Sequence, residues 1–245
     1  MAKGSRETAA LRSLRNQVQQ TLSHLELVDA SLALTARTAS RAGDKNQPLL
    51  KALGVNGRYD TLHLPARQHQ QLVNQSRGQN LELSLRAFYT HFLDYLRSVL
   101  QVVHKRQPLE LVRDAAVDLE PWEIAAAEDE EELRRLHLVH AFRNLEVRGS
   151  AELLLDRTVE ELGLALADEV RTEALQYLEL RNQFLHNGGR ADDRYARIYG
   201  ESMRVKAGNN LPRSAKLGRK AAKAIEALCV ELDRQLLGKR LLKAS

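Results

Sequence analysis

Residues 81–105 read LELSLRAFYTHFLDYLRSVLQVVHK and carry a strong helical pattern. Their large apolar side chains recur every three or four positions, which places them on one face of an α-helix. These residues are Leu81, Leu85, Phe88, Tyr89, Phe92, Leu96 and Leu100. Four of the chain's eleven aromatic residues fall in this stretch, so we expect the centre of the core to lie on this helix.

Outward from this stretch, the same period predicts further amphipathic helices. They cover about residues 7–39, 47–53, 151–163, 165–187, 192–200 and 217–237, and a further helix starts at the acidic run 128–132 and continues to about residue 147. Pro65 suits the first turn of another helix, which we expect Gly78 to interrupt, and residues 57–64 look irregular. The alternation typical of strands is weak throughout. The sequence therefore predicts one all-α domain over residues 1–245.

The composition agrees with a helical protein that has a real core. Of 245 residues, 43% are hydrophobic and 28% are charged, and only 5 are proline. A single cysteine, Cys229, excludes a disulfide scaffold and a thiolate zinc cluster, and its place on an apolar stripe predicts a core position. No apolar run reaches the length of a membrane span, and the N-terminus lacks the apolar core of a signal peptide. We expect a cytoplasmic protein without membrane contact.

The positive charge is concentrated at the C-terminal end. The net charge is +5, but residues 203–245 hold 11 basic and 3 acidic residues. A basic segment can neutralise phosphates, so we expect this helical segment at about 203–245 to contact RNA. The alternative is a solvated helix face that keeps the protein soluble. The candidate RNA contacts are Lys216, Arg219 and Lys220, together with Arg190, Arg194 and Arg197.

Residues 178–190 read LELRNQFLHNGGR and carry the candidate chemistry. The spacing Arg-x4-His is by itself uninformative, because it occurs four times in the chain. The pairs are Arg58/His63, Arg86/His91, Arg135/His140 and Arg181/His186. Only the last pair has asparagine directly after arginine, and there Gly188 and Gly189 mark the end of the helix.

This segment resembles the signature of the HEPN family, which is an arginine, a polar residue, a few spacers and a histidine. The following residues 191–200, ADDRYARIYG, resemble the family's continuation after the histidine. The order of the helices resembles the family over most of residues 7–240, whereas the motif itself covers only about 20 residues. The resemblance implies a HEPN-like bundle of long helices that forms a symmetric dimer, with the two motifs facing each other.

The resemblance also implies a metal-independent endoribonuclease that leaves 2′,3′-cyclic phosphate ends. RNA carries its own nucleophile, the ribose 2′-hydroxyl, and a histidine can remove or supply the proton. A guanidinium can hold two oxygens of a phosphate that gains charge. His186 would be the acid/base, Arg181 the phosphate clamp and Asn182 a positioning hydrogen-bonder.

Helix geometry constrains this site. Residues i and i+5 lie about 140° apart on a regular helix, whereas i and i+4 are neighbours. Asn182 and His186 therefore share a face, and Arg181 points elsewhere. Either the last turn of the helix distorts, or two chains share the site.

The resemblance further implies an RNA substrate (tRNA or mRNA), no cofactor and no metal. It suggests a toxin–antitoxin or phage-defence role, with an antitoxin or sensor protein as a further partner. Some HEPN toxins carry a tyrosine two residues after the histidine, where this chain has Gly188. The family's acidic residue in the aromatic helix corresponds to either His91 or Asp94. The alternatives are a non-catalytic HEPN-like module that binds RNA, a nucleotide or a protein, and a helical scaffold without any nucleic-acid role.

Overall fold

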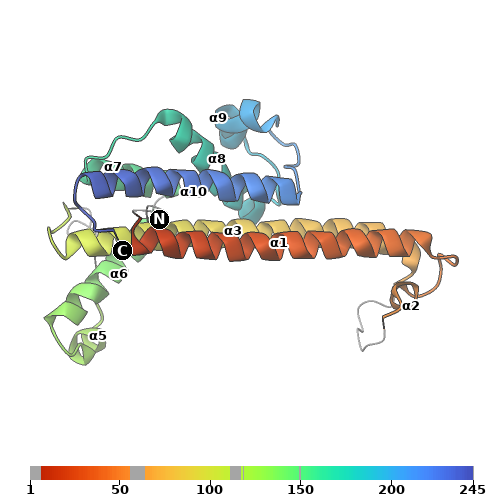
Figure 1. Ribbon diagram of the computed structural model, residues 1–245, viewed down its shortest axis with the longest axis horizontal. Coiled ribbons are helices and arrows are strands. Elements are labelled where there is room, and N and C mark those ends of the chain that lie inside the picture. Colours follow the sequence, from red (N-terminus) through yellow and green to blue (C-terminus); the bar gives the residue numbers. More distant parts are fainter. Residues whose placement is uncertain (1–6, 56–63, 111–116, 118, 149, 245) are drawn as a thin grey trace, which may run out of the picture.

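The computed structural model describes residues 7–55, 64–110, 117, 119–148 and 150–244. These residues form α-helices and one short 3-10 helix, and they contain no strand (Figure 1). The all-α fold class predicted from the sequence is therefore confirmed. Most of the irregular segment expected over 57–64 lies outside the described residues.

Four long helices surround the core. Helices α1 (Ala9–Arg41) and α3 (His69–His104) run side by side along the molecule in opposite directions, each about 50 Å long at 1.5 Å per residue (Figure 1). Helix α10 (Ala215–Gly238) packs along both, and α8 (Asp168–His186) packs against α3 and α10. The bounds of α1, α8 and α10 agree with the predicted ranges to within a few residues.

The shorter helices lie around this group of four. Helix α2 and the 3-10 helix η2 contact α1, at the end of the α1–α3 pair (Figure 1). Helices α6 and α7 contact α3, and α9 packs against α8. Their bounds are Leu49–Leu53 for α2, Ala66–Gln68 for η2, Pro121–Ala126 for α5, Glu130–Arg148 for α6, Ala151–Glu161 for α7 and Asp193–Met203 for α9. Pro65 stands directly before η2 as its N-cap.

The core is centred on α3, as its apolar period predicts. Phe88, Phe92 and Leu100 have no exposed surface. The buried Tyr95 donates a hydrogen bond from its hydroxyl to the carbonyl of Cys229 on α10 (3.2 Å). Cys229 is itself fully buried, which confirms its predicted place in the core.

Gly78 does not interrupt α3, contrary to the expectation from the sequence. The helix runs unbroken from His69 to His104, and Gly78 is buried within it. A Cβ atom at Gly78 would lie 3.0 Å from Cδ of Arg213, so the glycine makes room for that side chain. One glycine costs a helix only about 1 kcal/mol relative to alanine, which the packing of a 36-residue helix outweighs.

Thr8 joins the start of α1 to the last turns of α10. Its hydroxyl caps α1 by accepting the N–H of Leu11 (3.1 Å). The Thr8 N–H donates to Oδ2 of Asp233 (3.1 Å), and the Thr8 hydroxyl donates to Oδ1. Burial raises the pKa of Asp233, and the two hydrogen bonds from Thr8 oppose that rise. The two ends of the described chain are therefore held together.

The contact between α10 and α1 depends on Gly218, where a Cβ atom would lie 2.3 Å from Cδ2 of the buried Leu25. We expect Gly218→Ala to lower the free energy of unfolding by about 1–3 kcal/mol, because it overpacks this contact. Gly238→Ala is the matched control, since open space surrounds that position. It should be neutral or stabilise by up to about 1 kcal/mol. Urea denaturation measures both, and equal effects of the two substitutions would contradict close packing at Gly218.

Candidate functional site

One face of α8 lines a pocket of about 400 Å³ between α8 and α9. Asn182 and Gln183 stand three and four residues after Glu179, and four and three residues before His186, so all four share this face. The rest of the lining consists of Ser150, Asn187, Asp192, Arg194, Tyr195, Ile198 and Tyr199. The pocket therefore joins two of the three residues of the predicted motif, Asn182 and His186, to the α9 segment that follows them.

Asp192 holds α9 against α8. Its carboxylate caps α9 by accepting the N–H of Tyr195 (2.7 Å). The same carboxylate accepts hydrogen bonds from the side-chain amides of Gln183 (3.0 Å) and Asn187 (3.2 Å) on the other wall of the pocket. The bond from the Tyr195 N–H is the largest cause that lowers the pKa of Asp192, and the two amide bonds add to it. The Tyr195 hydroxyl donates to the carbonyl of Gln176 (3.0 Å), which fixes α9 at a second point.

The glycine pair after His186 ends α8 and brings in the C-terminal segment. Gly188 and Gly189 have φ values of 61° and 80°, the left-handed region that glycine tolerates. A Cβ atom at Gly189 would lie 2.7 Å from Nη2 of Arg213 and 2.9 Å from the ring of Phe184. Arg213 stacks over that ring at 5.6 Å and donates to the carbonyl of Gly188 (2.9 Å). The glycines are therefore required by the turn and by the close approach of Arg213.

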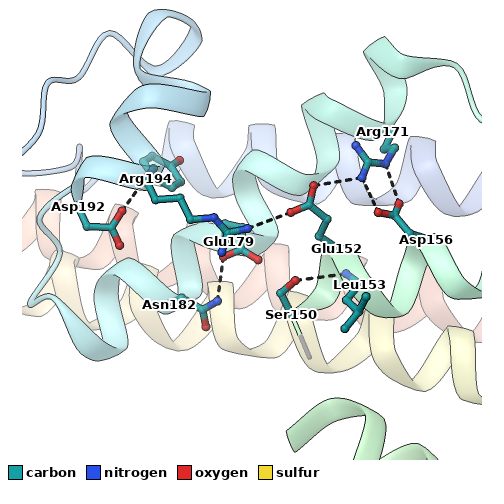
Figure 2. Close-up of polar contacts among 10 residues, drawn as sticks. Ser150, Glu152, Leu153, Asp156, Arg171, Glu179, Asn182, Asp192 and Arg194 are labelled. Atoms are coloured by element: carbon teal, nitrogen blue, oxygen red, sulfur yellow. Dashed lines mark hydrogen bonds and ion pairs between the residues drawn. The ribbon is translucent and has the colours of Figure 1, made fainter. Parts of the chain in front are cut away.

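Asn182 connects a buried carboxylate to the motif arginine. Its amide Nδ2 donates to Oε2 of Glu179 (3.0 Å), and its Oδ1 accepts from Nη1 of Arg181 (3.0 Å). Figure 2 shows Asn182 pointing from α8 toward Glu179. The guanidinium of Arg181 lies over the ring of Tyr89 on α3, 4.7 Å from its centre. The contacts of Asn182 are those of a residue that orients an arginine.

Glu179 is a site residue that the sequence analysis did not single out. Only 8% of its surface is exposed, and within the described part of the chain its Oε1 atom is buried without a hydrogen-bond partner. Buried polar atoms in proteins nearly always have a partner, so this atom is an unusual feature of the pocket. The signal in the sequence is its spacing, since Glu179 stands three and seven residues before Asn182 and His186 on one helix face.

Arg181 does not share the pocket of His186. It lines a second pocket of about 400 Å³ between α8 and α3, together with Tyr89 and Asp94. Helix α8 continues to His186, and the N–H of Asn187 still bonds to the carbonyl of Gln183. The last turn is therefore helical, and the distortion considered as one alternative is not present.

The second pocket contains one of the two candidates for the acidic partner. Asp94 lines it beside Arg181, whereas His91 is directed toward α1, with its Nε2 atom 3.0 Å from Oγ1 of Thr21. Burial lowers the pKa of His91. Asp94 is therefore the residue of the aromatic helix that accompanies the motif arginine.

The predicted RNA contacts lie beside the pocket. Arg190, Arg194 and Arg197 are exposed around the end of α8 and on α9. Arg194 lines the pocket and forms an ion pair with Glu152 of α7 (3.1 Å), as Figure 2 shows.

Lys216, Arg219 and Lys220 are exposed on the first turns of α10, and Arg219 pairs with Glu26 of α1 (3.1 Å). In Figure 1, these turns and α9 are both drawn above the middle of the α1–α3 pair. The structure therefore places one basic residue, Arg194, in the pocket and the others outside its lining.

Ion pairs hold α7 against α8 beside the pocket. Arg171 of α8 donates two hydrogen bonds to Asp156 (2.9 and 2.8 Å) and one to Glu152 (3.1 Å) (Figure 2). These hydrogen bonds raise the pKa of Arg171, and bonding to Asp156 is the largest cause. Burial, together with the nearby carboxylates of Glu152 and Glu179, raises the pKa of Tyr199 to about 12. The tyrosine hydroxyl is therefore neutral at physiological pH.

Comparison of the chain with protein-family models, with curated proteins and with solved structures finds no match. No helix among the described residues is long and apolar enough to cross a membrane. The same residues contain no group of three or more His, Cys, Asp or Glu side chains that would hold a metal ion. The relation to the HEPN family therefore rests on the resemblance seen in the sequence.

Asp192 offers a test of how the pocket is held together. Because its pKa is lowered in the folded state, its charge contributes stability above the ordinary pKa of 3.8, and this contribution is lost as the pH falls through the lowered value. Asparagine can still cap α9, but its amide nitrogen cannot accept the hydrogen bonds from Gln183 and Asn187. We therefore expect Asp192→Asn to lower the free energy of unfolding at pH 7 by about 1 kcal/mol, and this deficit to shrink below pH 4. Denaturant unfolding at several pH values measures it.

Asp193→Asn, one residue further along in the first turn of α9, is the matched control. It should change the free energy of unfolding by no more than about 0.5 kcal/mol. A deficit of Asp192→Asn that is the same at pH 3 and pH 7 would show that the charge of Asp192 plays no part.

Proposed function

We propose that the protein is a metal-independent endoribonuclease of the HEPN type that acts as a symmetric dimer. The 2′-oxygen of a ribose forms a bond to the adjacent phosphorus while the bond from phosphorus to the 5′-oxygen breaks. The products are a 2′,3′-cyclic phosphate and a 5′-hydroxyl. The observation that supports this best is the pocket in which Asn182 and His186 meet, with Asn182 also hydrogen-bonded to Arg181.

His186 is suited to the proton transfers. It is exposed at the end of α8, so it is accessible to an RNA chain. A neutral imidazole takes the proton from the attacking 2′-hydroxyl, and an imidazolium supplies one to the leaving 5′-oxygen. The nucleophile comes from the RNA itself, so the protein needs only an acid/base and a group that binds the phosphate.

Arg181 is suited to hold that phosphate. Its guanidinium is kept in place from two sides, by the ring of Tyr89 and by the oxygen of Asn182. Asn182 takes one of the five N–H donors of an arginine, so the fork can still bind two phosphate oxygens. A guanidinium fixed before the substrate arrives stabilises the charge that develops during the reaction.

The positions of Arg181 and His186 on α8 support the proposed dimer. In a dimer with a two-fold axis across the exposed ridge of this helix, Arg181 of one chain would lie near the histidine of the other. Leu185, 38% exposed, lies on this ridge, and the exposed Ile198 stands on α9 beside the pocket. Exposed apolar side chains of this kind suit an interface in which both subunits use the same patch.

The proposed setting is a toxin–antitoxin or phage-defence system in the cytoplasm, with tRNA or mRNA as the substrate. The exposed basic residues Arg190, Arg197, Lys216 and Lys220 supply contacts to the RNA backbone outside the pocket. An active ribonuclease would harm its own cell, so an antitoxin or a sensor protein is expected to control it. These statements rest on the family resemblance and on the charge of the surface.

RNA cleavage in EDTA tests the function. Wild type should cleave tRNA or mRNA and leave 2′,3′-cyclic phosphate ends, and His186→Ala should be slower by at least about 100-fold, because general acid–base catalysis contributes that much. His24→Ala, at an exposed histidine of α1, is the matched control and should keep the wild-type rate. Mapping of the product ends identifies the chemistry.

Two outcomes would overturn the proposal. Cleavage by His186→Ala at the wild-type rate would remove this histidine from the mechanism. No cleavage by any of the three folded proteins would favour the non-catalytic binding module instead.

A further inference from the structure

We propose that the pocket between α8 and α9 binds the guanine base of the nucleotide whose 2′-hydroxyl attacks, and that Glu179 recognises this base. The inference rests on the proposed function and adds a substrate preference to it. It predicts cleavage on the 3′ side of guanosine. The motif residue Asn182 satisfies one oxygen of the Glu179 carboxylate, and the proposal is based on the other oxygen.

In the part of the chain that the structure describes, one oxygen of the Glu179 carboxylate receives no hydrogen bond, and a ligand could supply the missing donor. Its Oε2 atom accepts the amide of Asn182 (3.0 Å), while its Oε1 atom is buried and, within the described residues, has no hydrogen-bond partner. The residue is 8% exposed and lines the pocket. Leaving a charged acceptor buried and unpaired is costly in free energy, so a ligand that brings an N–H group is stabilised at this point.

The chemistry of a carboxylate selects guanine among the four RNA bases. An ionised carboxylate only accepts hydrogen bonds. Guanine presents two neighbouring donors on its Watson–Crick edge, the N1–H and the 2-amino group. Adenine and cytosine place one amino group beside an acceptor, and uracil has one N–H between two carbonyls. Proteins that bind single-stranded RNA commonly read splayed bases by such edges.

The spacing of the side chains along α8 fits one nucleotide. Glu179 and His186 are seven residues apart on one face, which is a rise of about 10 Å along the helix. That is comparable with the distance from the Watson–Crick edge of a base to the sugar–phosphate of the same nucleotide. A guanine at Glu179 therefore brings its ribose to His186, with Asn182 between them. A pocket of about 400 Å³ lies within the range of small-ligand sites.

Arg194 is a lining side chain that can move when the base enters. It lines the pocket, and its side chain is 58% exposed and paired with Glu152. An exposed ion pair contributes at most about 1 kcal/mol, so the guanidinium can leave Glu152 at little cost. Once released, it can pair with a phosphate of the incoming RNA. Entry of the base then requires only the rearrangement of a surface side chain.

Binding of mononucleotides tests the proposal without any cleavage. Isothermal titration calorimetry at low salt compares guanosine, inosine and adenosine 3′-monophosphate on the wild-type protein. Guanosine 3′-monophosphate should bind at least about tenfold more tightly than adenosine 3′-monophosphate. One good bidentate contact to a base gives a difference in affinity of this size. Inosine 3′-monophosphate keeps the N1–H but lacks the 2-amino group, so its affinity should lie between those of the other two nucleotides.

Two variants test the role of Glu179. Glu179→Gln should lose the preference for guanosine, because an amide presents a donor as well as an acceptor. Glu169→Gln, at an exposed position in the first turn of α8, should keep it. Thermal unfolding checks that both variants fold. If Glu179→Gln does not fold, the binding of the three nucleotides to the wild-type protein still tests whether the pocket prefers guanine.

The outcomes separate this proposal from the proposed function. Preferential binding of guanosine supports the base site even if RNA is not cleaved. Equal binding of the three nucleotides, no binding of any, or an unchanged preference in folded Glu179→Gln would overturn it. RNA cleaved without preference for guanosine would overturn the base site and leave the ribonuclease in place.

Discussion

The helical path of α8 as far as His186 is the constraint on which the site depends. A regular helix holds Arg181 and His186 about 140° apart, so the two residues face different pockets of one chain. The same regularity places Asn182 and Glu179 on the face of His186. In the proposed function, one side of the helix presents the phosphate clamp and the other presents the acid/base beside a buried carboxylate. A composite site between two chains is the proposed arrangement that brings the clamp and the acid/base together.

The surrounding structure maintains this helix and its two pockets. Tyr89 of α3 supports Arg181 on one side, and Asp192 holds α9 over the other. After His186, two glycines in left-handed conformation turn the chain, and Arg213 occupies the space that a side chain at Gly189 would need. Because Arg213 also fits against Gly78 in the middle of α3, the end of the motif is anchored to the helix that centres the core.

The sequence predicts those features that depend on one helix at a time. The apolar period over 81–105 predicts the core, because burial of one helix face requires no knowledge of the partner. The spacing within α8 likewise predicts the separation of Arg181 from His186. The prediction that Gly78 interrupts a helix is wrong. The glycine makes room for Arg213, which is far away in the chain, so its role cannot be predicted from the neighbouring residues. The sequence does not reveal Glu179, because the burial of its carboxylate depends on how α9 folds back over α8.

Complementation between two inactive chains tests the shared site most directly. Arg181→Ala and His186→Ala are co-expressed with different tags, so that mixed dimers form. Random pairing makes half of the dimers mixed, each with one intact site, and should restore about a quarter of the wild-type cleavage rate. As a control, wild type is co-expressed with the chain that carries both substitutions, and the mixed dimers are purified through both tags in each case. Purified mixed dimers of the two single variants should show about half of the wild-type rate, whereas those of the control contain no intact site and should be inactive. Mixed dimers that remain as inactive as each variant alone would contradict a site built from two chains.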